Sequence, residues 1–525
     1  MRARSLLKIA VITFAAAFIV GCGGGAVEET GYNEPPVQTT PAPIETPQPT
    51  YVPEPTAELE PELTWEHDFQ RVVLQVGNPR KLVNNAWVDL DASPIFVDGE
   101  LYTPIYGVEI SGESIVAWDE QSQTMVITTG VSGLPQSVMY GQINGQREEW
   151  YGSPLSIQIA NNLTMLQRHD GGWPRGIGQG GSAPHNPADI ASITQEQLDQ
   201  AFLSVNANDA YFGRGITANE TRFMLRMYHA TRIPQFRESG LRGLDAILRT
   251  QFTEGGAAGG WPYYVTQRTA HRGGASFNDD SMTAIMELLF DISNGEFPLL
   301  GHDLIAQSTT AFDKGLDAIL NLQIRSSAFA DGIERPTAWA QHYYQMSGLP
   351  MWAREFEPPA ISTNEAVDIM IFLMELPNPC QRVIDAVNYA MYFLNYVEIH
   401  GYRHYIGPSP IDPAWGNNRG LFEHPYAGNL WARFVCVETF NPLFVDRLNP
   451  GWRTGEVTDA EGRHGVRMPY PGGILRNIYR EDGTLDLMAS YQNLSHERRN
   501  GYGYLGDWPR ILTGMHNSWL RRIAE

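Results

Sequence analysis

The stretch RGLDAILRTQ at residues 242–251 is repeated as KGLDAILNLQ at residues 314–323, with a fainter copy, NLTMLQ, at residues 162–167. Two of these copies continue into the same tetrapeptide, GGWP, at residues 171–174 and 259–262. Each copy has the apolar stripe of a helix, and a single helical hairpin cannot bury its own apolar face. The repeat therefore predicts a mainly α fold of stacked hairpins, an (α/α) toroid or barrel whose loops meet at one end. This helical domain is expected to span residues 150–525.

Three further parts are predicted before the helical domain. Residues 1–22 have a basic start, a short apolar run and Cys22 after a small residue, which is typical of a lipoprotein signal peptide. An ordinary signal peptide or a short anchor is the alternative. Residues 23–64 form a Pro/Glu-rich linker, and residues 65–132 form a small β-rich module with a DG hairpin signal at residues 98–99. We therefore expect an extracytoplasmic protein, lipid-anchored to the cell surface at Cys22 or secreted.

Composition excludes some functions. The formal net charge of −22 argues against nucleic-acid binding, which needs a basic surface. Eight of the acids lie between residues 26 and 64, so the acidity belongs partly to the linker. No Cys/His spacing resembles a zinc site. Besides Cys22, the chain has Cys380 and Cys436, which are expected to be buried thiols or to form a single bridge.

Three charged segments carry the candidate chemistry: FNDDSM at residues 277–282, WAREFEPP at residues 352–359 and WARF at residues 431–434. Carboxylates bind hard cations, and an arginine fork matches a carboxylate with two hydrogen bonds. The combination predicts a site that holds an anionic sugar together with a divalent cation.

Each of these residues also has a purely structural interpretation. Asp279 and Asp280 begin a helical run, where acids cap free N–H groups, although two adjacent acids point in different directions. Arg354 has Glu355 and Glu357 as neighbours and could simply be ion-paired. The tryptophans of the two GGWP segments either plug the helix ends or border a cleft in which sugar rings stack.

Together these segments resemble the family 10 polysaccharide lyases (pectate lyases), from about residue 157 to residue 524. The resemblance rests on residues 171–174, 220–226, 259–262, 276–282, 339–342, 352–359 with Glu365, 431–434 and 497–502. It implies an (α/α) barrel and calcium-assisted β-elimination on α-1,4-linked polygalacturonate. The partner it implies is an acidic plant polysaccharide, and we expect the protein to be a monomer.

The resemblance also implies roles for single residues. Asp279 and Asp280 would be catalytic acids that bind calcium, and Arg354 would be the Brønsted base. Substrate would be bound by Arg433, which clamps a carboxylate, and by Arg175, Trp173, Trp261 and His342. An arginine base needs calcium and neighbouring cations to lower its pKa steeply, which predicts an alkaline optimum.

The chain departs from the family pattern at one important place. Family members commonly read DNGAT where this chain reads GRGIT at residues 213–217, so Gly213 and Arg214 stand in place of Asp-Asn. Asp209 could replace the missing acid only if the loop folds differently. Arg175 stands where a lysine is frequent. The β-rich module resembles the copper amine oxidase N-terminal-like domain, which implies no copper.

Two other functions fit the sequence. The change at Gly213 is compatible with a polyuronate-binding surface lipoprotein that has little or no turnover. An α/α-toroid glycoside hydrolase would need two opposed carboxylates, for which Asp279 or Asp280 with Glu357 or Glu365 could serve. That scheme leaves the arginine-rich segments without a role.

Overall fold

The structure is a computed structural model that describes residues 70–83, 86–90, 93–97, 100–102, 115–119, 124–129, 144, 146, 148–176, 190–191, 193–266, 270–407, 419–447, 456–458, 464–467 and 472–524. The predicted signal peptide, the predicted linker and the lipidation site at Cys22 lie outside these residues. Within the described residues, no helix has the length and apolar character needed to cross a membrane.

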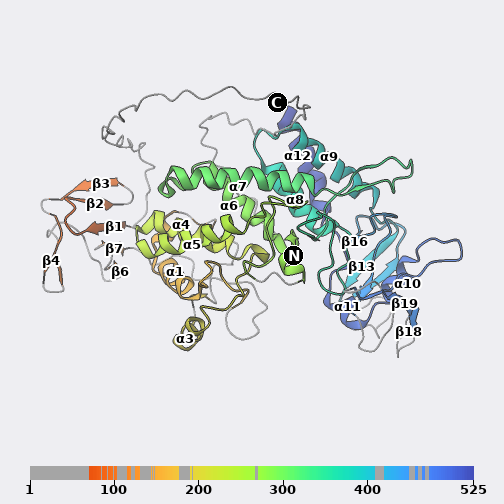
Figure 1. Cartoon of the computed structure of the whole chain (residues 1–525), viewed down its shortest axis with the longest axis horizontal. Coiled ribbons are helices and arrows are strands. Elements are labelled where there is room, and N and C mark those ends of the chain that lie inside the picture. Colours follow the sequence, from red (N-terminus) through yellow and green to blue (C-terminus); the bar gives the residue numbers. More distant parts are fainter. Residues whose placement is uncertain are drawn as a thin grey trace, which may run out of the picture.

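Stacked helical hairpins form the body of the protein (Figure 1). The inner row consists of α4 (Ala218–Thr231), α6 (Ser281–Ser293), α8 (Thr363–Glu375) and α12 (Arg510–Ala524). The outer row consists of α1 (Pro154–Leu166), α5 (Pro234–Thr250), α7 (His302–Asn321) and α9 (Gln381–Tyr396). Each inner helix packs on the next, and α5 packs on α7 and α7 on α9. The predicted α/α hairpins are thus present, in an arrangement consistent with a helical toroid.

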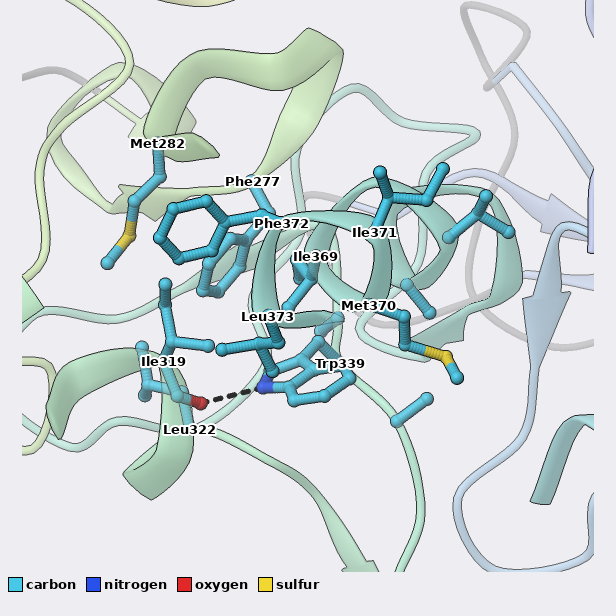
Figure 2. Packing of buried hydrophobic residues seen from close by; sticks show 14 of the residues in the cluster. Phe277, Met282, Ile319, Leu322, Trp339, Ile369, Met370, Ile371, Phe372 and Leu373 are labelled. Atoms are coloured by element: carbon cyan, nitrogen blue, oxygen red, sulfur yellow. Dashed lines mark hydrogen bonds between the residues drawn. The ribbon is translucent and has the colours of Figure 1, made fainter. Parts of the chain in front are cut away.

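Four buried tryptophans attach the loops to the ends of the outer helices. Each donates its indole N–H to a carbonyl in the last turn of the preceding outer helix: Trp173 to Leu163 (2.8 Å), Trp261 to Ile247 (2.8 Å), Trp339 to Ile319 (2.7 Å) and Trp431 to Leu394 (2.8 Å). Figure 2 shows the Trp339 bond, with Leu373 of α8 beside the indole. The last four carbonyls of a helix have few intrahelical partners, and each indole donates to one of these four; the Leu163 carbonyl also accepts from the Gln167 backbone N–H (3.1 Å).

The glutamine that ends each sequence repeat has an equivalent role. The side-chain amide of Gln251 donates to the carbonyls of Gly259 (2.9 Å) and Ala311 (2.8 Å). Gln167 and Gln323 make the same pair of bonds, one to the following loop and one to the next outer helix. The repeated sequence thus encodes the joint between a helix end, its loop and the next hairpin.

The loops before the inner helices are joined by short antiparallel pairings. In chain order, the pairs are Pro174 with Ala210, Tyr211 with Tyr264, β8 (Ala275–Ser276) with β11 (His342–Tyr343), β12 (Ile361–Ser362) with β16 (Phe434–Val435), and β15 (Trp431–Ala432) with β21 (Leu505–Gly506). Loops that are distant in sequence therefore lie next to each other at the N-terminal ends of the inner helices.

Two β-rich parts flank the helices. The N-terminal part has a sheet of order β3-β2-β1-β7-β6 and a β4-β5 hairpin. Its strands are β1 (Gln70–Gln75), β2 (Arg80–Val83), β3 (Ala86–Asp89), β4 (Ile95–Val97), β5 (Glu100–Tyr102), β6 (Ile115–Asp119) and β7 (Thr124–Thr129). The hairpin lies where the DG signal predicted it, whereas β2 and β3 were not predicted.

The second β-rich part precedes α12. It contains the hairpin of β13 (Tyr402–Ile406) and β14 (Arg419–Glu423) and a sheet of order β17-β20-β19-β18. The strands of this sheet are β17 (Val445–Asp446), β18 (Glu456–Thr458), β19 (His464–Arg467) and β20 (Ile474–Leu475), and the helices α10 (Leu487–Gln492) and α11 (His496–Gly501) follow it. Elsewhere in the chain lie α3 (Gln195–Leu203), β9 (Arg325–Ser326) and β10 (Arg335–Pro336). Cys436 is a free thiol, so the bridge considered between Cys380 and Cys436 does not form in the described part of the chain.

A histidine in this second β-rich part makes stability depend on pH. Burial, followed by the charge of Arg419, lowers the pKa of His404 to about 4. Its ring contacts the Tyr491 hydroxyl (3.0 Å). Above pH 6.5 the imidazole is neutral in both the folded and the unfolded chain. As the pH falls below that value, the unfolded chain takes up a proton first, so the free energy of unfolding should drop by up to about 3 kcal/mol before pH 4.

Urea unfolding between pH 7 and pH 4 measures this effect. His404→Gln should flatten the pH dependence, whereas the same change at the exposed His400 should leave it as it is. An unchanged pH dependence in His404→Gln would contradict the assignment.

Candidate active site

The three charged segments converge at the N-terminal ends of the inner helices. Gln341 joins the first two, because its amide donates to Asn278 Oδ1 and to Glu357 Oε1 (3.3 Å). The ring of Tyr502 joins the second to the third, with the guanidinium carbon of Arg354 5.7 Å and that of Arg433 5.1 Å from its centroid. The predicted acids and both arginines therefore belong to one site.

Asp279 and Asp280 immediately precede α6 in a strained backbone conformation. Their φ angles are +50° and +58°, in the left-handed region that residues other than glycine rarely adopt. Asp280 occupies the N-cap position, yet its side chain makes no capping hydrogen bond in the described part of the chain. The Oδ2 atom of Asp279 accepts hydrogen bonds from the Tyr263 hydroxyl (2.8 Å) and from Asn278 Nδ2 (2.9 Å). Helix capping therefore does not account for these acids.

Arg354 is held by a buried carboxylate. Glu357 accepts hydrogen bonds from Arg354 Nε (2.7 Å), from its Nη2 and from its backbone N–H (3.0 Å). The Glu357 side chain is 2% exposed, whereas that of Arg354 is 46% exposed. Burial acts to lower the pKa of Arg354, but the hydrogen bond and the charge of Glu357 outweigh it and raise the pKa above its ordinary value. In the protein without calcium and substrate, the partner of Arg354 is therefore an anion, and the lowering of this pKa by calcium and neighbouring cations stays a prediction.

Arg433 repeats this arrangement. Its Nη2 contacts Glu365, a buried residue in the first turn of α8 that also accepts from the Ser362 hydroxyl. Burial acts to lower the pKa of Arg433, and the charge of Glu365 more than compensates, so the pKa is raised. In the protein without calcium and substrate, both arginines therefore carry a positive charge, and each is paired with its own buried glutamate.

Sequence reasoning missed several residues of this site. Tyr502 donates its hydroxyl to Glu357 (2.9 Å). The ring of Phe356 has the guanidinium carbons of Arg354 (4.9 Å), Arg447 (4.8 Å) and Arg498 (4.1 Å) close to its centroid. Tyr502 and Arg498 lie in the ERRNGY segment that supported the resemblance, whereas nothing in the sequence pointed to Arg447.

A pair of tyrosines occupies the space beside Gly213. The hydroxyls of Tyr211 and Tyr263 lie 2.5 Å apart, and the Tyr263 hydroxyl also donates a hydrogen bond to Asp279. A Cβ atom on Gly213 would lie 2.6 Å from Tyr263 Cε2 and even closer to the Tyr211 hydroxyl. Asp209 makes hydrogen bonds to Arg168 at 2.6 and 3.1 Å. Asp209 is therefore engaged elsewhere and does not replace the missing acid.

Three of the predicted substrate-binding residues have structural roles instead. Trp173 and Trp261 are fully buried, so neither indole can stack on a sugar, and the helix-end interpretation is the correct one. His342 is 1% exposed and packs edge-on against Tyr263, with ring centroids 5.3 Å apart, so it supports the site from behind. Arg175 is half-buried, with its guanidinium carbon 5.8 Å from the centroid of Tyr211, and remains a candidate for substrate contact.

The donor set suits a hard cation. Asp279 and Asp280 are adjacent carboxylates, and Arg354 and Arg433 are already paired with Glu357 and Glu365. Calcium takes six to eight oxygen ligands. The described residues contain no group of three or more His, Cys, Asp or Glu side chains that could hold a metal ion. A calcium ion here would therefore need further oxygens from backbone carbonyls, water or the substrate.

Comparison with known proteins identifies the family of the chain. A family model described as pectic acid lyase matches residues 167–467, more than half of the chain. The chain belongs to the pectic acid lyase family. It is accordingly a polysaccharide lyase, as the resemblance predicted.

One solved structure supports the fold of this lyase. The family 10 polysaccharide lyase from Cellvibrio cellulosa aligns with a TM-score of 0.50 and 18% identity, over 72% of this chain and 94% of that chain. A point mutant of that enzyme in complex with trigalacturonic acid aligns with a TM-score of 0.49 and 18% identity, over 72% of this chain and 98% of that chain. No curated protein matches the lyase.

Proposed function

We propose that this lyase cleaves α-1,4-linked polygalacturonate by β-elimination. The observation that carries the proposal is that two guanidiniums meet two carboxylates that do not cap the following helix. The two arginines match the carboxylates of a polyuronate, and the family to which the chain belongs supports the same substrate. One solved structure that aligns with the chain holds trigalacturonic acid.

The reaction requires charge neutralisation at the uronate carboxylate. A base removes the proton at C5, the bond between C4 and the glycosidic oxygen breaks, and a double bond forms between C4 and C5. The leaving oxygen takes a proton from solvent. Negative charge builds up on the uronate carboxylate during proton removal, so contacts with guanidiniums or a cation lower the barrier. Arg433 is proposed to bind this carboxylate.

Arg354 is proposed as the base. Its exposed guanidinium lies in the same site as the two acids, and it is linked to Asp279 through Glu357, Gln341 and Asn278. Because Glu357 raises the pKa of Arg354, the neutral form is scarce before substrate binds. We therefore expect the rate to rise with pH through the alkaline range.

Replacing Glu357 tests this role. Glu357→Gln removes the negative charge that keeps the proton on Arg354, so the pKa of the guanidinium should fall and the alkaline limb of kcat should move to lower pH. The measurement is the pH profile of kcat on trigalacturonate. Glu365→Gln, which acts on Arg433, is the matched control and should leave the limb in place. A limb that stays fixed in Glu357→Gln would show that Arg354 acts as a cation and not as a base.

Calcium belongs to the proposal as the assisting cation. Asp279 and Asp280 would hold it, and when bound it would neutralise the substrate carboxylate. Elimination gives an unsaturated product that absorbs ultraviolet light, so the test of function is absorbance on polygalacturonate with calcium. No absorbance under any condition, with polygalacturonate still retarding the protein in affinity electrophoresis, would favour a polyuronate-binding protein instead.

That second function has an observation in its favour. Gly213 offers no carboxylate, and the adjoining space is filled by Tyr211 and Tyr263. Attachment to the cell surface through Cys22 and a monomeric state remain proposals for either function.

A further inference from the structure

The tyrosine pair beside Gly213 is well placed to act on the acids of the site. Tyr263 is 7% exposed, and its hydroxyl contacts Tyr211 (2.5 Å), Asp279 Oδ2 (2.8 Å) and Asn278 Nδ2 (2.5 Å). Tyr211 is completely buried. The contact between the two hydroxyls therefore fixes the Tyr263 hydroxyl in place, and this hydroxyl donates a hydrogen bond to the Asp279 carboxylate.

The Tyr263 hydroxyl is the donor in its hydrogen bond to Asp279 Oδ2 (2.8 Å). A phenol that donates a hydrogen bond is a weaker ligand for a hard cation than a carboxylate is. The pair therefore acts on a metal site by orienting a ligand.

The hydrogen bonds from Tyr263 and Asn278 hold the Asp279 carboxylate in one orientation. Its backbone is held at a φ of +50°, and the following residue is also in the left-handed region. The bonds from Tyr263 and Asn278 both reach Oδ2. Within the described residues these hydrogen bonds reach only Oδ2, so we assign Oδ1 as the oxygen that faces a cation. Hydrogen bonds of this kind to a ligating carboxylate commonly contribute a factor of about 10 to 100 in metal affinity.

We propose that Tyr263, supported by Tyr211, is a positioning residue that orients Asp279 for calcium. The proposal rests on the calcium centre of the proposed function. It explains how the site can work without an acid at Gly213: the volume beside the glycine is taken by two hydroxyls that fix the neighbouring carboxylate. The described residues provide few oxygen ligands for calcium, so calcium affinity depends more strongly on the orientation of each ligand.

Calcium titration of the full chain tests the proposal. Isothermal titration calorimetry with calcium chloride, with and without trigalacturonate, is run on the unmodified protein, Tyr263→Phe and Tyr211→Phe. Tyr263→Phe keeps the ring and removes the donor, so the dissociation constant should rise about 10-fold or more. Tyr211→Phe removes only the supporting hydroxyl and should have a smaller effect in the same direction.

Tyr264→Phe is the matched control. Tyr264 lies next to the pair, with its ring centroid 4.9 Å from that of Tyr211, and its substitution should leave calcium affinity unchanged. Thermal unfolding of each variant shows whether the fold is kept. An unchanged dissociation constant in Tyr263→Phe, or no saturable calcium binding by the unmodified protein in either condition, overturns the proposal. If Tyr263→Phe weakens calcium binding more than Tyr211→Phe does, but no unsaturated product forms, the proposal stands and the lyase function is rejected.

Discussion

Arg354→Ala is expected to lower kcat on trigalacturonate by about 10³-fold or more, because it removes a group that we propose contacts the reacting sugar. The Arg354 side chain is 46% exposed, so its removal creates no cavity in the core. The buried Glu357 keeps hydrogen bonds from Tyr502 and Gln341 after the change. Because Glu357 also loses its charged partner, thermal unfolding of the variant is measured beside product formation, which is followed by ultraviolet absorbance and should be lost.

Two further variants make this result specific. Arg354→Lys keeps the positive charge without the planar fork and should recover only a small part of the rate. Arg325→Ala removes an exposed arginine from the loop that also carries Arg354, where it pairs with the exposed Glu334, and should leave the rate unchanged. An Arg354→Ala protein with full activity would remove the mechanism.

Asp446→Ala is expected to cost about 3 to 5 kcal/mol of unfolding free energy, because it removes the carboxylate that is bonded to a buried guanidinium. Asp446 and Arg476 are 3% and 2% exposed and are joined at 2.7 Å. Asp446 also accepts from the backbone N–H and the hydroxyl of Ser495, the N-cap residue of α11. The pair therefore connects β17 and the end of β20 to α11.

The effect should reach the active site. The backbone N–H of Gly473, next to β20, donates to the carbonyl of Glu355 (2.7 Å), and the Tyr504 hydroxyl contacts both the Phe356 carbonyl (3.3 Å) and that of Val445. Chemical unfolding and kcat measured on the same samples should both decline. Asp446→Ala combined with Arg476→Met should recover part of the stability, since no unpaired charge remains. Glu334→Ala, in an exposed pair, should change stability little.

Local sequence patterns were enough to predict the helical hairpins. The repeat at residues 242–251 and 314–323 forms the C-terminal parts of α5 and α7, as expected from its apolar stripe. The tetrapeptide GGWP marked two of the four tryptophans that bond to helix ends. Trp339 and Trp431 lack that tetrapeptide, so their equivalence became visible only in the hydrogen bonds.

The composition of the site was predicted better than its electrostatics. The three charged segments were expected to meet, and they do. The sequence offered Glu355 or Glu357 as an ion-pair partner of Arg354; a turn brings Glu357 back onto the guanidinium, which raises the pKa of Arg354 in the protein without calcium. Tyr502 comes to lie between two arginines that precede it by 148 and 69 residues, and no local pattern encodes such a contact.

The indole bonds at the helix ends have a consequence for how this architecture diversifies. Each hairpin carries its own attachment point, so the segment that leaves it can lengthen wherever it is not paired with a neighbouring loop. The segment between α6 and the preceding α5 is short, whereas the one that enters α12 contains a hairpin, a sheet and two helices. Insertion at these joints offers a route by which one helical framework can acquire new sugar specificities.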